Sequence, residues 1–385
     1  MSITFVLHEA TRTGAPRVGA LIAAGLQKYE EVRAIVLRDG PLVPWLEDLL
    51  GRERLVVCRG EEFAHKVPFA QKLREAESLL SGDESDLIYV NSVAASVFVL
   101  AGRSRGRRTI LHVHEKAAEL RTLLRLEGTK MEIAGVADGI VLAARELLAD
   151  LHAVFGNLSD KVLDFGIVVD VDAMQRLAHA PVAPPRNAIG KPWIQDGRMA
   201  VGMCGTASRR KGADIFLETA AQAPEFDFLW IGGWAPPDAP DNPVCAEFEK
   251  RALPNFFITG SVDNPYAYLD RLTVFFLSSR EDPNPLVLAE SALMRVPILA
   301  FSSTTAVTDW LGRAGILCYG APNAADALRV LRAIDPAEIR SPEFRALGDS
   351  MTAGFDLTAK LDGLRQFIAS VRGQPAPGTG AEERA

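Results

Sequence analysis

The chain has 385 residues, 48% of them hydrophobic, a length that favours two domains and a composition that can fill two cores. Its formal net charge of −7 argues against nucleic acid as the main partner. No apolar run approaches the ~20 residues of a membrane-spanning helix, and residues 1–7 have the pattern of a strand rather than of a signal peptide.

The four cysteines lie far apart in the sequence, at Cys58, Cys204, Cys245 and Cys318. Their spacing does not match that of a metal site, so we expect reduced thiols and no cysteine-bound metal. Together with the first residues, this predicts a cytoplasmic protein.

In the first half of the chain, apolar segments that suit strands alternate with segments of helical character. The predicted strands span residues 3–7, 32–37, 54–58, 86–92, 109–115, 139–144 and 162–167. The predicted helices span residues 17–28, 41–50, 93–101 and 171–178. This alternation predicts an α/β fold with a parallel sheet, which binds ligands at the carboxyl ends of its strands.

Two predicted strands end in candidate functional residues. After the first strand, Gly14 lets a ligand approach the backbone closely, although an ordinary loop would look much the same, and His8 suits either the core or a ligand-facing position. His112 and His114 point the same way from the strand 109–115. Because no further Cys or His stands nearby, we expect no zinc site, and a buried, hydrogen-bonded histidine is the alternative to a functional one.

Two charged segments have a structural and a functional interpretation. The basic loop 102–108 is solvated surface, or else a contact for anionic lipid or a phosphorylated acceptor at the inner face of the membrane. The Asp170-Val171-Asp172 segment has the form of a metal-binding motif, but it opens a predicted helix, so we interpret it as an N-cap.

The second half of the chain restarts the alternation after a Pro-rich linker at residues 181–195. Its predicted strands span residues 199–204, 226–233, 255–262, 272–277 and 296–301. One predicted helix begins at residue 215, and three others span residues 286–295, 324–334 and 357–371. The Pro/Gly-rich, charged tail 373–385 is predicted to be disordered.

A basic turn follows the strand 199–204, with Arg209, Arg210 and Lys211 before Gly212. The glycine fingerprint of dinucleotide-binding folds and the P-loop motif are both missing, which argues against a dehydrogenase. A basic turn at the carboxyl end of a strand can clamp a diphosphate, whereas in an arbitrary loop it would be solvated surface.

The segment 279–290 combines a strand end, a polar corner and a helix start. The first helical amides lack intrahelical partners and favour an anionic group such as a diphosphate. Asp282 lies at the mouth of the corner, and Glu290 lies about one turn into the helix. Taken alone, Asp282 could equally cap the helix, and Glu290 could be a solvated helix residue.

Together these motifs resemble the retaining glycosyltransferases of family 4, which have the GT-B fold. The family has two Glu residues separated by seven residues, where this chain has Asp282 and Glu290. The turn that ends in Lys211-Gly212 resembles the family's diphosphate loop, the turn at Gly14 its N-terminal glycine loop, and the ending at His114 its cleft histidine. The resemblance covers most of the chain and is strongest in residues 199–301.

The resemblance implies two Rossmann-like domains with parallel sheets that face an interdomain cleft. It places the acceptor domain at residues 1–180, the linker at 181–195 and the nucleotide-sugar domain at 196–350. It also implies that a C-terminal helix at 351–372 returns to the N-terminal domain, before the tail 373–385.

For the donor, the resemblance implies that Lys211 holds the diphosphate. Thr206 stands where the family has an arginine, so Arg210, or else Arg209, would substitute for it. The loop at Val262 would hold the nucleotide base. Residues 302–308 replace a Gly-Gly and a Glu of the family, so part of the donor pocket is expected to differ.

At the helix start, the resemblance implies that the amides of Leu286 and Val287 add to the diphosphate clamp. Glu290 would accept hydrogen bonds from the ribose hydroxyls, Asp282 would orient the hydroxyls of the donor sugar, and His114 would line the reaction side.

The implied function is transfer of a sugar, with retention, from a nucleotide-diphosphate sugar to a saccharide or lipid-linked acceptor, in polysaccharide or glycolipid biosynthesis. No metal and no cofactor are expected. Two alternatives stay open: another GT-B enzyme such as a nucleotide-sugar epimerase, and a non-catalytic binding subunit. The Asp at position 282 and the missing Gly-Gly motivate the latter.

Overall fold

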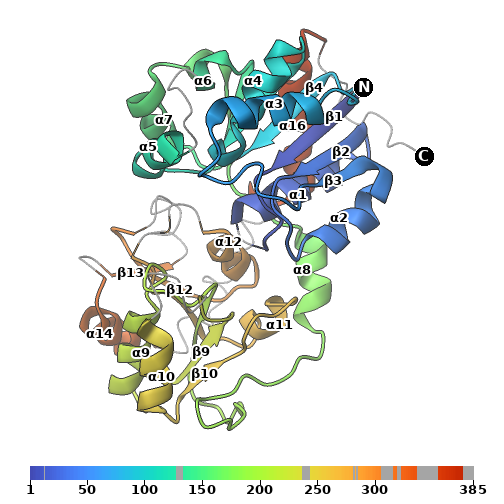
Figure 1. Cartoon of the computed structure of the whole chain (residues 1–385). Helices are drawn as coiled ribbons and strands as arrows, with labels where there is room; N and C mark the ends of the chain where they lie inside the picture. The colour runs from blue at the N-terminus through green and yellow to red at the C-terminus, as the bar shows by residue number, and fades with distance from the viewer. Residues whose placement is uncertain are drawn as a thin grey trace. The chain divides into compact units, whose positions relative to one another are not determined.

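A computed structural model (Figure 1) describes residues 1–12, 14–126, 133–235, 243–280, 282, 285–304, 315–318, 322–335 and 354–375. The chain forms two compact units. Unit 1 combines Met1–Val168 with Phe355–Ala385, and unit 2 is Val169–Gly354. Each unit is described by itself below.

Unit 1 contains a seven-stranded sheet in the order β3-β2-β1-β4-β5-β6-β7. All of its strand pairs are parallel. The strands are β1 (Ser2–Leu7), β2 (Glu31–Val36), β3 (Leu55–Val57), β4 (Leu87–Asn91), β5 (Arg108–Val113), β6 (Gly139–Leu142) and β7 (Val162–Asp164).

The helices of unit 1 cover both faces of this sheet. They are α1 (Gly14–Leu26), α2 (Val43–Leu50), α3 (Phe69–Leu79), α4 (Val97–Ser104), α5 (Ala117–Leu126), α6 (Ile133–Val136), α7 (Leu147–Phe155) and α16 (Leu357–Arg372). Three short 3₁₀ helices join them: η1 (Arg52–Arg54), η2 (Val93–Ala95) and η3 (Ser159–Lys161).

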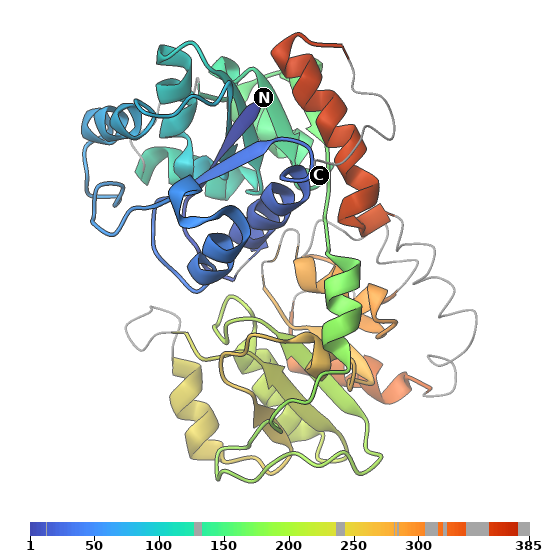
Figure 2. The same ribbon diagram turned by 90° about the vertical axis from the view of Figure 1, so that its right-hand side faces the viewer.

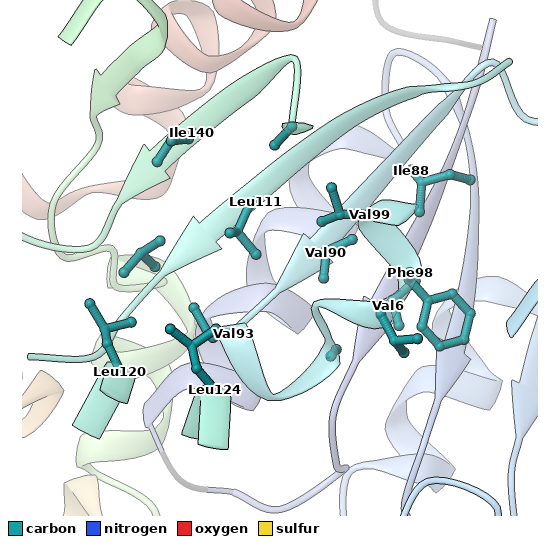
Figure 3. Packing of buried hydrophobic residues seen from close by; sticks show 14 of the residues in the cluster. Val6, Ile88, Val90, Val93, Phe98, Val99, Leu111, Leu120, Leu124 and Ile140 are labelled. Carbon is teal, nitrogen blue, oxygen red and sulfur yellow. The ribbon is translucent and has the colours of Figure 1, made fainter. Parts of the chain in front are cut away.

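An apolar core fills one face of the sheet (Figure 3). Side chains from alternate strand positions, including Val90, Leu111 and Ile140, meet Phe98 of α4 and Leu120 of α5, and all five are fully buried. Burial of apolar surface on this scale is the main favourable term in folding. The core therefore holds the carboxyl ends of β4 and β5 in fixed positions.

The other face of the sheet is covered by α1 and by α16, drawn in red in Figure 2. A Cβ added to Gly25 of α1 would lie 2.8 Å from a methyl carbon of Leu361, so the two helices approach closely. Asp356 caps α16, because its Oδ2 accepts a hydrogen bond from the Ala359 amide, and Gly373 ends the helix in the left-handed conformation.

Unit 2 contains a six-stranded parallel sheet in the order β10-β9-β8-β11-β12-β13. Its strands are β8 (Ala200–Cys204), β9 (Asp227–Ile231), β10 (Phe256–Ile258), β11 (Val274–Leu277), β12 (Ile298–Phe301) and β13 (Gly315–Cys318). Its helices are α8 (Val171–Ala178), α9 (Ala213–Gln222), α10 (Pro243–Arg251), α11 (Tyr266–Leu269), α12 (Leu286–Leu293) and α14 (Ala324–Ala333).

The predicted α/β class and the parallel sheets are confirmed. The N-cap interpretation of Asp170 is also confirmed, since its Oδ1 accepts a hydrogen bond from the Ala173 amide at 2.8 Å. The structure adds elements that the sequence analysis left out, among them α3, α5, α7, α10 and β13. The predicted disordered tail falls largely outside the described residues. Within the described part of the chain, no helix is long and apolar enough to cross a membrane.

Candidate functional site

Each sheet reverses its strand order next to its first strand. In unit 2 this happens between β8 and β11, and in unit 1 between β1 and β4. In open parallel sheets, ligands bind beyond the carboxyl ends of the strands at such a reversal, next to the loops that follow its two strands. In unit 2 these loops are the basic turn and the segment that contains Asp282.

Hydrogen bonds join the two loops of unit 2. The Ser278 hydroxyl donates to the Lys211 carbonyl at 3.0 Å. The Arg280 amide donates to the Arg210 carbonyl at 2.9 Å, and the Arg280 guanidinium donates to the Arg209 carbonyl at 2.7 Å. The basic turn therefore has a fixed position against the end of β11.

Arg280 also forms a two-pronged ion pair with Asp214 in the first turn of α9. Its Nη1 and Nη2 donate to the two carboxylate oxygens at 2.6 and 2.7 Å. Planar guanidinium groups suit this geometry. Arg280 was not predicted from the sequence, because its acceptors lie far away along the chain.

Gly212 is required where the two loops meet. Its φ is +71°, and a Cβ at this position would lie 1.9 Å from the Ser278 carbonyl oxygen. A side chain would therefore be strained and would also push the loops apart. This gives the Lys-Gly pair of the sequence motif a physical reason.

Lys211 and Asp282 form an ion pair at the carboxyl ends of β8 and β11. The Lys211 Nζ lies 2.5 Å from Asp282 Oδ2. Asp282 is buried and also accepts a hydrogen bond from the Ser279 hydroxyl at 3.1 Å. The sequence analysis gave the two residues separate roles, whereas the structure pairs them directly.

Helix α12 begins shortly after Asp282 in the sequence. Pro285 precedes the helix, and among the described residues no side chain caps it, so Asp282 is not its cap. The amides of Leu286 and Val287 belong to the first turn, where backbone donors lack intrahelical acceptors. A diphosphate would satisfy such donors.

Glu290 is a buried carboxylate on α12. Glu290 is only 2% exposed, so it is not the solvated helix residue that the sequence left as an alternative. The Tyr266 hydroxyl donates to its Oε1 at 3.0 Å. A buried carboxylate with a fixed partner can present its other oxygen in a defined direction. Tyr266 is a second residue that the sequence analysis missed.

The remaining predicted donor-site residues of unit 2 lie on loops. Thr206 and Arg210 are exposed, and Val262 is partly exposed. Arg209 is also exposed, so the choice between the two arginines stays open. Of the segment 302–308, the part from residue 305 lies outside the described residues.

In unit 1, Gly14 and His114 lie near the ends of β1 and β5. Gly14 is the first residue of α1 and is exposed. His114 Nε2 lies 2.9 Å from Asn91 Oδ1, and the Asn91 Nδ2 donates to the Ala15 carbonyl at 2.8 Å. The side chain of Asn91, which ends β4, therefore connects His114 with the start of α1.

Glu115 ties the ends of β4 and β5 together. Its carboxylate accepts hydrogen bonds from the Ser92 hydroxyl at 2.5 Å, the Val93 amide at 3.2 Å and the His114 amide at 2.8 Å. Ser92 has a φ of +88°, which is uncommon for a residue other than glycine. These bonds hold that conformation, and the sequence analysis did not identify Ser92 or Glu115 as site residues.

Burial sets the charges of this cluster. It lowers the pKa of His114 to about 3, with a further lowering by His8. It also lowers the pKa of His112 well below its ordinary value, and the rings of His112 and His114 lie in contact with centroids 4.1 Å apart, tilted by 32°. Burial raises the pKa of Glu115 to about 7. Both histidines are therefore neutral near neutral pH.

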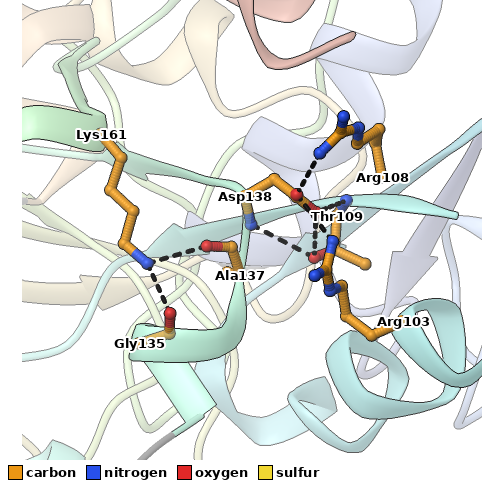
Figure 4. Close-up of polar contacts among 7 residues, drawn as sticks. All are labelled: Arg103, Arg108, Thr109, Gly135, Ala137, Asp138 and Lys161. Carbon is orange, nitrogen blue, oxygen red and sulfur yellow. Dashed lines mark hydrogen bonds and ion pairs between the residues drawn. The ribbon is translucent and has the colours of Figure 1, made fainter. Parts of the chain in front are cut away.

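The basic loop 102–108 makes contacts within unit 1 (Figure 4). Arg103 and Arg108 each donate to Asp138 Oδ1 at 2.8 Å, and the Thr109 amide donates to Asp138 Oδ2 at 2.9 Å. Arg107 donates to the Asp83 carbonyl at 2.8 Å. These arginines support the fold at the start of β5.

Metal ligands were not expected, and within the described residues no group of three or more His, Cys, Asp or Glu side chains is arranged to hold a metal ion.

Part of the chain is similar to a known sequence family. Residues 198–334, which lie within unit 2, match the model of a family described as Glycosyl transferases group 1. No curated protein matches the chain.

Solved structures resemble nearly the whole chain. Anabaena HepE in complex with UDP-glucose is 17% identical, with a TM-score of 0.75 over 96% of this chain and 100% of that chain. Sucrose-phosphate synthase from Thermosynechococcus elongatus is 14% identical, with a TM-score of 0.73 over 97% and 99%. A UDP-N-acetylglucosamine 2-epimerase is 12% identical, with a TM-score of 0.62 over 98% and 99%.

At this level of identity, the likeness establishes the fold. The chain has two Rossmann-like units of the GT-B class, as the sequence analysis predicted.

Proposed function

We propose that this protein is a glycosyltransferase, which moves a sugar from a nucleoside-diphosphate sugar to an acceptor. The observation that carries the proposal is the pairing of Lys211 with Asp282 beside the start of α12, at the strand-order reversal of unit 2. This is the unit whose sequence matches Glycosyl transferases group 1.

The diphosphate binds to Lys211 and to the amides of Leu286 and Val287. Negative charge grows on the diphosphate as the bond to the sugar breaks. A fixed ammonium and the positive end of α12 stabilise that charge without reorganisation. Asp282 neutralises Lys211 before the donor arrives. With the donor bound, the ammonium interacts with both groups.

The other predicted residues surround this centre. Glu290 accepts hydrogen bonds from the ribose hydroxyls, and Asp282 also orients hydroxyls of the transferred sugar. Arg210, or Arg209 in its place, and Thr206 extend the diphosphate site. In addition, the loop at Val262 contacts the base. In unit 1, Gly14 lies where it leaves space for a ligand, and His114 lines the reaction side.

The family-4 resemblance supports retention of configuration without a metal ion. In this mechanism the acceptor attacks from the side on which the diphosphate leaves, and the diphosphate takes the acceptor proton. Catalysis then rests on positioning and electrostatics rather than on a protein nucleophile.

A UDP-sugar is the first donor to test, because HepE resembles this chain in fold and its structure contains UDP-glucose. We propose a saccharide or lipid-linked acceptor, and a role in polysaccharide or glycolipid biosynthesis. Residues 196–350 would bind the donor, residues 1–180 would bind the acceptor, and the basic loop 102–108 is the candidate for peripheral membrane contact.

A nucleotide-sugar epimerase is the second candidate. The likeness to a UDP-N-acetylglucosamine 2-epimerase, with a TM-score of 0.62, favours keeping it. An epimerase would convert its nucleotide sugar without an acceptor, which separates the two functions experimentally.

Binding is tested first by thermal shift with UDP, UDP-glucose, UDP-N-acetylglucosamine and GDP-mannose, since a ligand of the native state raises its melting temperature. Lys211→Ala should weaken binding of UDP more than binding of uridine, because the ammonium meets the diphosphate. Equal losses of affinity for UDP and uridine would show that Lys211 does not contact the diphosphate.

Turnover is then measured as UDP release with and without acceptor sugars, in the presence of a chelator. Acceptor-dependent release that survives the chelator supports the proposal. Activity that is abolished by the chelator and restored by manganese or magnesium would contradict metal independence. Conversion of UDP-N-acetylglucosamine without an acceptor would identify an epimerase instead.

A further inference from the structure

The orientation of the Asn91 amide is determined by its surroundings. Asn91 is fully buried at the end of β4, and its Nδ2 lies 2.8 Å from the Ala15 carbonyl oxygen. A carbonyl oxygen only accepts hydrogen bonds, so the NH₂ group of Asn91 must face Ala15. The opposite orientation would bring two acceptors together. The Asn91 Oδ1 therefore faces His114.

This orientation determines the protonation of the His114 ring. The Nε2 atom lies 2.9 Å from Asn91 Oδ1, which can only accept. The Nε2 must therefore carry a proton. In a neutral imidazole the other nitrogen, Nδ1, then carries a lone pair.

We propose that Asn91 is a positioning residue that holds the His114 proton on Nε2 and thereby makes Nδ1 a hydrogen-bond acceptor. A ligand group that meets Nδ1 must supply a donor, such as the hydroxyl of a sugar. A carboxylate or a phosphate oxygen would meet a lone pair. The tautomer follows from this chain alone, whereas the nature of the ligand rests on the proposed function.

Two neighbours keep this arrangement in place. Gly19 of α1 lies against the Asn91 amide, since a Cβ at position 19 would lie 2.7 Å from both Asn91 Cγ and Nδ2. The His112 ring also contacts the His114 ring, with centroids 4.1 Å apart. The depressed pKa of His114, about 3, keeps the ring neutral in solution near neutral pH.

The test is NMR of the full-length protein labelled with ¹⁵N-histidine. The protein has six histidines. The His114 signal is assigned by its loss in His114→Gln. We expect a protonated Nε2, an unprotonated Nδ1, and slow exchange of the Nε2 proton with water. His152, whose ring contact with Ser159 is exposed, is an internal reference for fast exchange. A proton on Nδ1, or a charged ring at pH 7, would overturn the proposal.

Substitutions at position 91 test the cause. Asn91→Leu removes the acceptor, so the share of the Nδ1–H tautomer should rise. The expected rise is about two- to tenfold, which is the change in an equilibrium constant that the loss of one neutral hydrogen bond causes. Asn91→Asp keeps an acceptor beside Nε2 and adds a charge, so the Nε2 proton should persist while the pKa of His114 rises. An unchanged tautomer ratio in Asn91→Leu would show that Asn91 does not hold the proton.

Gly19→Ala provides a second test, in which the residue at position 91 is unchanged. Its methyl group would displace the Asn91 amide, so exchange of the His114 proton should become faster. Gly363→Ala on α16 is the matched control, since a Cβ there would meet no atom of the described chain within 4 Å. Equal exchange rates in the two variants would contradict the role given to the Asn91 amide.

A titration with UDP-glucose examines the acceptor. If the thermal shift shows binding, the Nδ1 signal should move in the direction of an accepted hydrogen bond. A bound ligand that leaves Nδ1 unchanged or protonates it would overturn the acceptor role. If UDP-glucose does not bind, the proposed donor is wrong, and the NMR of the free protein still decides the tautomer.

Discussion

At the scale of single residues, the pairing of Lys211 with Asp282 changes what a substitution at either position should do. A carboxylate 2.5 Å from an ammonium lowers the charge that the ammonium offers to an incoming diphosphate. Glu290, in contrast, accepts a hydrogen bond from the neutral hydroxyl of Tyr266. The two acidic residues of the motif are therefore not equivalent.

We expect Glu290→Gln to weaken UDP binding and Asp282→Asn to leave it unchanged or to strengthen it. Loss of a charge-assisted hydrogen bond costs about 1.5–3 kcal/mol, or roughly 10- to 150-fold in affinity. Asp282→Asn should nevertheless slow sugar transfer. Calorimetric titration of UDP into both variants measures the difference, and a reversed order of affinities would mean that the roles of the pair are exchanged.

Glu115 makes the stability of unit 1 depend on pH. Its folded pKa of about 7 lies above the ordinary value of 4.5. The stabilisation that comes from this shift is therefore complete below about pH 4.5 and is lost as the pH rises through about 7. One pKa unit corresponds to about 1.4 kcal/mol, so the loss amounts to about 3 kcal/mol.

Glu115→Gln should remove this dependence. The amide also loses a hydrogen bond, because its NH₂ group meets the backbone N–H of either His114 or Val93, but this cost does not vary with pH. The variant should therefore gain stability relative to the wild type between pH 5 and pH 8 by about 3 kcal/mol. Urea unfolding at several pH values measures the difference, and a difference that is constant with pH would show that Glu115 does not titrate in this range.

The histidines act in the opposite direction. The folded pKa values of His112 and His114 are depressed, so their contribution is present above about pH 6.5 and is lost as the pH falls. The comparison between wild type and Glu115→Gln cancels this contribution, because both proteins contain the same histidines.

At the scale of elements, the sequence predicted most of the buried strands and many of the helices, and it missed several helices and one strand, among them α3, α5, α7, α10 and β13. Continuous apolar runs such as β11 are typical of parallel strands and were recognised. Helix α10 carries four charged side chains among its nine residues, which interrupt its apolar pattern. Such elements are stabilised by the surface on which they pack, which a local pattern does not contain.

The candidate site divides in the same way. Lys211, Asp282 and Glu290 belong to local motifs and were predicted from them. Arg280, Tyr266 and Asn91 act through partners that are distant in the sequence, since Arg280 contacts Asp214 and Asn91 contacts His114. No local spacing indicates such a contact, so only the folded structure identifies it.

Arg280 is expected to position the basic turn. Arg280→Lys cannot form the two-pronged pair with Asp214 and also bond the Arg209 carbonyl. We therefore expect UDP affinity to fall by about three- to tenfold, which corresponds to one or two weakened hydrogen bonds. The matched control is Arg332→Lys, because Arg332 bonds Glu225 and the Gln222 carbonyl elsewhere in unit 2. Equal affinities in both variants would limit Arg280 to a role in stability.

At the scale of the whole molecule, unit 1 is built from both ends of the chain. Leu361, Leu364 and Ile368 of α16 are buried in it. Arg372 at the end of α16 is paired with Glu30 at 2.7 Å and with Asp86 at 2.6 Å. Unit 2 is one continuous segment between these parts. Its proposed nucleotide site uses residues of that segment only, so the two units can be perturbed separately.

We expect urea to unfold the chain in two steps, one for each unit. Leu364→Ala removes a fully buried side chain from α16 and should lower the stability of unit 1 by about 2–5 kcal/mol. UDP should instead raise the midpoint of the step that belongs to unit 2.

Leu177→Ala is the control, since Leu177 is 39% exposed and its loss should shift neither step by much. Intrinsic tryptophan fluorescence reports mainly on unit 2, whose range contains four of the five tryptophans, at positions 193, 230, 234 and 310, whereas unit 1 contains Trp45. If Leu364→Ala and UDP shifted one and the same step, the units would unfold as a single cooperative body, and the separation of their roles would have to be abandoned.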